Sequence, residues 1–235
     1  MKLKFCLLLL LTGLFILIGK PMMAQSNNTA GLYFGGGLNN IFTDANSLAY
    51  EHTNYMFGLS FGAVYSLNFK NNINIDIGLG YDQKGYKDTV YGKTVDQNLT
   101  PDYDSDYGMI EWKINYISLP VLIGYNFGCK FSVTPQIGVF ASNLINGKVR
   151  YPVFENDKLV GYENSSINKS IRPYDFGYLA SLKLNFHISN ALNVFARSFY
   201  RASLVSYTSH DYDVYIDKRH YGMNLIFGVC FTIKN

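Results

Sequence analysis

Residues 174–188 read Tyr-Asp-Phe-Gly-Tyr-Leu-Ala-Ser-Leu-Lys-Leu-Asn-Phe-His-Ile. All eight even-numbered positions carry apolar or aromatic side chains, and the odd-numbered positions are polar, charged or glycine except for one leucine. A period of two is typical of a β-strand with one apolar and one polar face. The stretch therefore predicts such a strand.

The same alternation recurs along the chain. In 221–233 every odd-numbered residue is apolar, and in 73–82 isoleucine, leucine and tyrosine alternate with asparagine, aspartate and glycine. Less regular copies lie at 31–39, 55–67, 116–127, 131–141 and 192–204. The sequence thus predicts an all-β chain with eight antiparallel strands.

The connections between these strands alternate in length. Short ones lie at 68–72, 128–130 and 189–191, and long ones at about 40–54, 85–113, 143–173 and 205–219. This order is typical of an outer-membrane β-barrel with short periplasmic turns and long extracellular loops. We therefore expect a transmembrane barrel in the cell outer membrane with both termini in the periplasm.

The apolar face of the strands carries aromatic residues at both ends, as expected where a barrel meets the two membrane interfaces. One belt contains Tyr55, Phe57, Tyr81, Tyr174, Phe176, Tyr200 and Tyr221, and the other Tyr65, Tyr125, Phe127, Phe131, Phe186 and Phe231. The opposite face is rich in small and polar residues, including Gly58, Ser60, Gly62, Ser66, Gly78 and Gly80. The apolar face is therefore predicted to contact lipid, and the polar face to fill the lumen.

Charged side chains on the polar face would lie inside the barrel. These are Asp76, Asp82, Asp175, Lys183, Arg197 and Arg201. The interior of an eight-stranded barrel is filled by side chains, so we expect a paired polar core and no open channel.

Composition excludes several classes of protein. The 235 residues are 48% hydrophobic, 16% aromatic and only 16% charged, which excludes a disordered chain. The basic residues are scattered among the acidic ones, so nucleic-acid binding is disfavoured. Beyond residue 24 no apolar run is long enough for a membrane-spanning helix.

Residues 1–24 resemble a cleaved secretory signal peptide, with Lys2 and Lys4 before an apolar run at 5–18 and cleavage expected after Ala24. An uncleaved anchor is the alternative. Residues 25–235 would then form a single outer-membrane β-barrel domain. The formal charge of +3 belongs to the three lysines of the signal.

Candidate catalytic and metal-binding residues give weak signals. His187 is expected on the polar face near a short turn, whereas His52, His210 and His220 fall in or beside long loops. Adjacency of Ser209, His210 and Asp211 says little about a triad, which is assembled across a fold.

The acidic stretch 102–106 alternates Asp102, Asp104 and Asp106, but Tyr107 and Lys113 occupy the positions where a calcium loop needs glycine and glutamate. Asp211, Asp213 and Asp217 repeat the acidic theme in the last loop. We expect hydrated loops there, and predict no catalytic, cofactor-binding or metal-binding residue. Cys129 and Cys230 could form one bridge, but are expected to be small packed residues.

Several motifs resemble the PorT-like outer-membrane β-barrel family. They are Tyr116-Ile117-Ser118-Leu119-Pro120-Val121-Leu122 with Gly124-Tyr125-Asn126-Phe127, then Gly80-Tyr81-Asp82-Gln83-Lys84-Gly85-Tyr86, Asp175-Phe176-Gly177, and the closing strand at 222–229. The resemblance implies an eight-stranded barrel in the outer membrane, and some relatives serve a protein secretion system. The chain ends Phe231-Thr232-Ile233-Lys234-Asn235, without the common terminal aromatic residue.

The sequence therefore predicts a monomeric, non-enzymatic outer-membrane barrel that contacts membrane lipid. Its role would be structural or interaction-based, through long extracellular loops that meet partner proteins, surface polysaccharide or other ligands. Two alternatives stay open. One is an accessory component of protein secretion across the outer membrane, and the other is an envelope lipid-modifying enzyme that uses Ser209 and His210.

Overall fold

The computed structural model describes residues 28–43, 53–91, 107–208 and 218–233. These form ten strands. They are β1 Asn28–Thr43, β2 Thr53–Asn68, β3 Ile73–Tyr91, β4 Tyr107–Tyr125, β5 Phe127–Gly128, β6 Phe131–Glu155, β7 Lys158–Ser166, β8 Tyr174–His187, β9 Leu192–Ser203 and β10 Lys218–Ile233. Within these ranges no helix is long and apolar enough to span a membrane.

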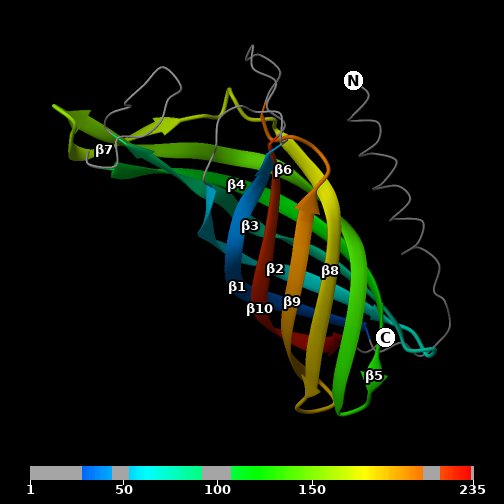
Figure 1. The fold of residues 1–235 in the computed structure, drawn as a ribbon. Helices are drawn as coiled ribbons and strands as arrows, with labels where there is room; N and C mark the ends of the chain where they lie inside the picture. The colour runs from blue at the N-terminus through cyan, green and yellow to red at the C-terminus, as the bar shows by residue number, and fades with distance from the viewer. Residues whose placement is uncertain (1–27, 44–52, 92–106, 209–217, 234–235) are drawn as a thin grey trace.

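Eight of the strands close into a ring, as predicted (Figure 1). The order is β4-β3-β2-β1-β10-β9-β8-β6, and β6 also pairs with β4, so the sheet closes on itself. Every pairing is antiparallel. The two remaining strands, β5 and β7, pair only with β6. Closure matters in lipid because an open edge would leave backbone N–H and C=O groups unpaired.

The short connections are also confirmed. Strands β2 and β3 are joined by residues 69–72, and Asn72 takes the left-handed backbone conformation with φ 65°. Strands β8 and β9 are joined by 188–191, where the Ser189 hydroxyl accepts hydrogen bonds from the amides of Ala191 and Leu192. Both turns lie at one end of the barrel, together with the start of β1 and the end of β10.

Two of the predicted long loops are wrong in part. Instead of a loop over 85–113, β3 continues to Tyr91 and β4 begins at Tyr107, and instead of a loop over 143–173, β6 continues to Glu155 and returns as β7. The reason is a reversal of the apolar face. Beyond the ring, outward side chains such as Lys113 and Arg150 are charged, and inward ones such as Trp112, Ile114 and Val149 are apolar.

The extended ends of β3, β4 and β6, together with β7, form a four-stranded sheet that projects to one side of the barrel (Figure 1). We call it the projecting sheet. Asn156 and Asp157 make its tight turn between β6 and β7, both with positive φ (49° and 64°). The predicted loops at 44–52 and 209–217 lie outside the described residues.

The apolar face points outward as predicted. Mid-barrel residues such as Ile137 are 68% exposed, and no residue of the two predicted aromatic belts is buried. Aromatic residues of the belt away from the short turns touch one another across strands. Tyr221 stacks on Phe42 at 4.1 Å, meets Tyr55 edge-on at 6.1 Å, and lies on the same face as Tyr81, which stacks on Phe61.

An arginine in place of Ile137 should test this orientation. A charge on the lipid face at mid-membrane costs about 2–4 kcal/mol, against about 0–1 kcal/mol near an interface. We therefore expect Ile137→Arg to lower the urea midpoint of the barrel in detergent-free lipid vesicles. Asn143→Arg, on the same strand and face but at the outer interface, is the matched control. Equal midpoints for the two variants would contradict a lipid-facing Ile137.

Candidate functional site

Charged side chains gather inside the barrel in three clusters. In the first, Asp76 accepts hydrogen bonds from Lys183 (Nζ to Oδ2, 3.0 Å), Arg197 and Gln136 (2.9 Å). All four side chains are buried. One carboxylate thus serves two cations from β8 and β9.

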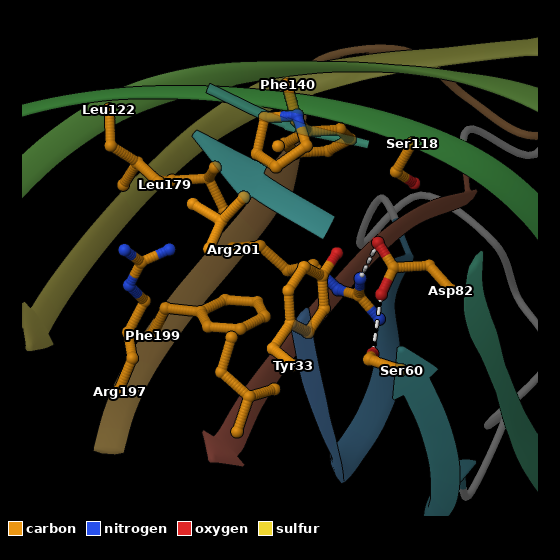
Figure 2. A pocket seen from close by; sticks show the side chains of 14 residues that line it. Tyr33, Ser60, Asp82, Ser118, Leu122, Phe140, Leu179, Arg197, Phe199 and Arg201 are labelled. Carbon is orange, nitrogen blue, oxygen red and sulfur yellow. Dashed lines mark hydrogen bonds and ion pairs between the residues drawn. The ribbon is translucent and has the colours of Figure 1, made fainter. Parts of the chain in front are cut away.

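The second cluster joins β1, β2, β3 and β9. Arg201 contacts Asp82 at 2.9 Å, and the Ser60 hydroxyl donates to the other carboxylate oxygen at 2.5 Å (Figure 2). A further nitrogen of Arg201 donates to the side-chain oxygen of Asn39 at 2.8 Å. The predicted paired polar core is therefore present for Asp76 and Asp82.

Asp175 forms the third cluster with Lys84. Lys84 is part of the motif at 80–86 but was not among the charged residues predicted to lie inside the barrel. Their contact is 2.6 Å long, and Ser203 donates to the same oxygen at 2.9 Å. The Lys84 ammonium also lies over the rings of Tyr116 (4.9 Å) and Phe140 (4.3 Å). The signal was available, because Lys84 continues the even-numbered inward positions of Asp76 and Asp82.

Aromatic side chains fill the lumen at the end away from the short turns. The hydroxyl groups of Tyr86 and Tyr207 are 2.7 Å apart, and the ring of Tyr86 stacks on Trp112 at 5.7 Å. The ring of Tyr207 stacks on His220 at 4.6 Å, and Tyr116 meets the same imidazole edge-on. His220 lies near the start of β10 and hence beside the predicted loop at 205–219, as expected. Its even position in β10 turns it into the lumen, where it is buried.

The lumen is also more apolar than the predicted glycine-rich and polar face. Leu122, Phe140 and Leu179 pack together inside it, and Val64, Phe195 and Ile226 form a second buried cluster. The reason is that a few large apolar side chains per strand share the inward parity with the small residues. They occupy the volume that the glycines leave.

A cavity of about 40 Å³ lies between these groups (Figure 2). Asp82, Arg197 and Arg201 border it, opposite Leu122 and Phe140. A void of this size holds on the order of one or two water molecules. Side chains therefore occupy the middle of the described lumen.

A wider vestibule of about 710 Å³ opens at the end with the short turns. Asparagines line it, among them Asn68, Asn74 and Asn126, together with His187. His187 lies where the sequence predicted, exposed beside a short turn, with Nδ1 3.3 Å from the carbonyl oxygen of Lys130.

The remaining candidates separate into two groups. Cys129 and Cys230 are free thiols, and only Cys230 is packed as expected, since Cys129 is exposed in a turn. Among the residues with described positions, no three His, Cys, Asp or Glu side chains are grouped to hold a metal ion. His52, the Ser209-His210-Asp211 stretch, the acidic stretch 102–106, and Asp213 and Asp217 lie outside the described residues.

Residues 23–206 match the family model described as "Outer membrane protein beta-barrel domain". The chain belongs to this family. It is therefore an outer-membrane protein that crosses the membrane with its strands, as the alternation and the closed ring indicate. No curated protein matches the sequence significantly.

Solved structures of other outer-membrane barrels are distantly similar. OprG of Pseudomonas aeruginosa is 10% identical (90% of this chain, 98% of that chain, TM-score 0.46). Ail of Yersinia pestis, solved with the heparin analogue sucrose octasulfate, is 11% identical (88% and 99%, TM-score 0.41). The protease OmpT of Escherichia coli is 10% identical (90% and 98%, TM-score 0.40). The assignment rests on the family match and the strand topology.

Proposed function

We propose that this member of the outer membrane protein beta-barrel domain family is non-enzymatic and presents the projecting sheet to binding partners at the cell surface. The single observation that carries the proposal is the projecting sheet itself. Four paired strands continue beyond the belt of Tyr55 and Tyr221. A barrel without such a role would need only loops there to join its strands.

Side-chain contacts connect neighbouring strands of the projecting sheet. The Tyr151 hydroxyl donates to Glu163 at 2.9 Å across the β6–β7 pair, and Arg150 lies over the ring of Tyr162 at 4.2 Å. Its surface also displays apolar groups, because Tyr107 is 60% and Val160 54% exposed. Exposed apolar and aromatic groups on a paired sheet suit contact with a protein or a polysaccharide.

The lumen supports the same conclusion by contrast. Asp76, Asp82 and Asp175 each form an ion pair with a buried cation. The cavity beside them has room only for water. Neither a solute path nor an accessible catalytic acid is built from the described lumen residues. Interaction at the outer end is thus the favoured role.

Shortening the β6–β7 hairpin tests the proposal. Tyr151 and Glu163 are directly paired, so residues 152–162 can be replaced by an Asn-Gly turn that suits two antiparallel strands. We expect normal heat-modifiable migration on gels, which reports barrel folding, and loss of the species photo-crosslinked from the outer end in native membranes. A control that replaces only Asn156-Asp157 with Asn-Gly should keep them. Unchanged crosslinking in the shortened variant would refute the proposal.

A second candidate is an accessory role in protein secretion, favoured by the PorT-like motifs. Those motifs meet in one place, because Lys84 and Tyr116 lie in contact inside the barrel. A deletion strain should then lose export of secreted cargo, and export should return with the full-length gene but not with the shortened hairpin variant. Normal export in the deletion strain would eliminate this candidate.

A further inference from the structure

A row of amide side chains follows directly above the lipid-facing surface of β3, β4 and β6. The Tyr81 hydroxyl donates to Asn115 at 2.7 Å, Gln83 donates to the same oxygen at 3.2 Å, and Asn115 donates to Asn146 at 2.6 Å. Tyrosines and amides of this kind are suited to the membrane interface, where a side chain has an apolar body and a wet tip. The row therefore marks where hydrocarbon ends on this side of the barrel.

Positive charge follows the amide row on the same outward face. Lys113 and Lys148 are directly opposite each other in the register of β4 and β6, and the next pair is Glu111 with Arg150. Lys87 is opposite Glu111 on the other side. We call Lys87, Lys113, Lys148 and Arg150 the outer cation band.

Glu111 lies among the cations of this band, and three of them contact its carboxylate. Lys87 and Lys113 contact it at 3.1 Å each, and Arg150 at 4.0 Å. Burial raises the pKa of Glu111, but hydrogen bonds from the two lysines outweigh burial and hold the pKa below its ordinary value. The carboxylate is therefore ionised, and the band keeps an excess of three positive charges over this acid.

Among the residues that the structure describes, no carboxylate forms an ion pair with Lys148, so part of this charge is not neutralised there. Like charges directly opposite on neighbouring strands destabilise a sheet, so the Lys113–Lys148 pair is unfavourable unless an anion lies between the two ammonium groups. The side chain of Lys113 is 46% exposed and can turn toward such an anion.

The position of the band relative to the hydrocarbon region indicates which anion it meets. Lys113 lies four residues beyond the lipid-facing Ile117, about 13 Å along the strand and less along the membrane normal because strands tilt. The headgroup region begins where the hydrocarbon ends. The cations are therefore at headgroup level, directly above an apolar surface that contacts the acyl chains of the same lipids.

We propose that the outer cation band binds the phosphate groups of lipid headgroups in the outer leaflet. Lysine and arginine form charge-assisted hydrogen bonds with phosphate oxygens, and basic clusters next to membrane-spanning segments recognise anionic headgroups. Continuity with the apolar face favours a lipid over a soluble phosphate, since one molecule can satisfy both surfaces. This site is separate from the projecting sheet's exposed apolar groups.

The test compares two double variants of the full mature chain folded in neutral detergent. Lys113→Gln/Lys148→Gln removes two charges from the band, and Lys70→Gln/Lys130→Gln removes two exposed charges at the short-turn end. Binding of phosphorylated lipid A is measured by native mass spectrometry. At about fivefold per lysine, the band variant should bind about 25-fold more weakly, with the control unchanged.

Two further measurements keep the proposal open to refutation. Glu111→Gln adds one net positive charge and should tighten lipid A binding about fivefold. Lipid A stripped of phosphate should bind all variants alike. Equal weakening in both double variants, or no change in the band variant, would overturn the proposal. Equal affinity for inositol hexakisphosphate and lipid A would also overturn it, since the band would then be a site for soluble anions.

Discussion

Replacing Asp76 with asparagine should lower the free energy of unfolding by about 3–5 kcal/mol, because it leaves buried cations uncompensated. Lys183 and Arg197 both direct their charge at this carboxylate, and all three side chains are buried. Urea unfolding followed by loss of heat-modifiable migration measures the change. This should be among the largest effects of any conservative substitution in the barrel.

Asp157→Asn is the matched control for that experiment, since Asp157 lies in an exposed turn with positive φ that asparagine also tolerates. It should change the unfolding free energy by less than about 0.5 kcal/mol. Adding Lys183→Met to Asp76→Asn removes one of the two cations left without a carboxylate. It should restore part of the lost unfolding free energy. If Asp76→Asn is as stable as the wild type, the three side chains do not form the buried ion cluster described above.

Replacing Gly85 with valine should be as damaging, for a different reason. Gly85 has φ 154°, and a Cβ atom there would lie 1.8 Å from the carbonyl oxygen of Trp112, which is backbone and cannot turn away. Backbone strain of about 1–3 kcal/mol adds to overpacking of about 1–3 kcal/mol. We expect a large fall in the urea midpoint and poor folding yield from the denatured state.

Gly161→Val provides the comparison within the projecting sheet, because nothing lies within 4 Å of a Cβ at Gly161. Its effect should stay within about 0.5 kcal/mol. If Gly85→Val folds as well as Gly161→Val, then β3 and β4 do not approach each other as closely as the structure has them.

Gly85 also shows that a sequence motif does not by itself predict tertiary contacts. The element from Tyr81 to Gly85 resembles a family motif, and nothing in its residue types shows that a carbonyl from the facing strand occupies the space above the glycine. Lys84 is similar. Its parity pointed inward, yet its partner Asp175 is 91 residues away in the chain, and closure of the ring is what brings the two together.

The strands beyond the ring were predicted as loops for one reason. The alternation predicts that the apolar face points outward, which is correct where lipid surrounds the barrel. Outside the membrane, water is the solvent, so the apolar side chains turn inward and the same alternation has the opposite sense. Tyr86 and Ile114 are buried in one cluster with Tyr116 and Tyr207, and the rings of these last two contact His220.

By itself the sequence determined the eight strands of the ring, their short turns, the lipid-facing side and hence the outer-membrane location, since each of these depends on local periodicity against one solvent. Only the tertiary structure decided which buried charges pair, how β3, β4, β6 and β7 continue as the projecting sheet, and that Lys113 faces Lys148. Those features depend on closure and register, which bring together residues that no local pattern connects.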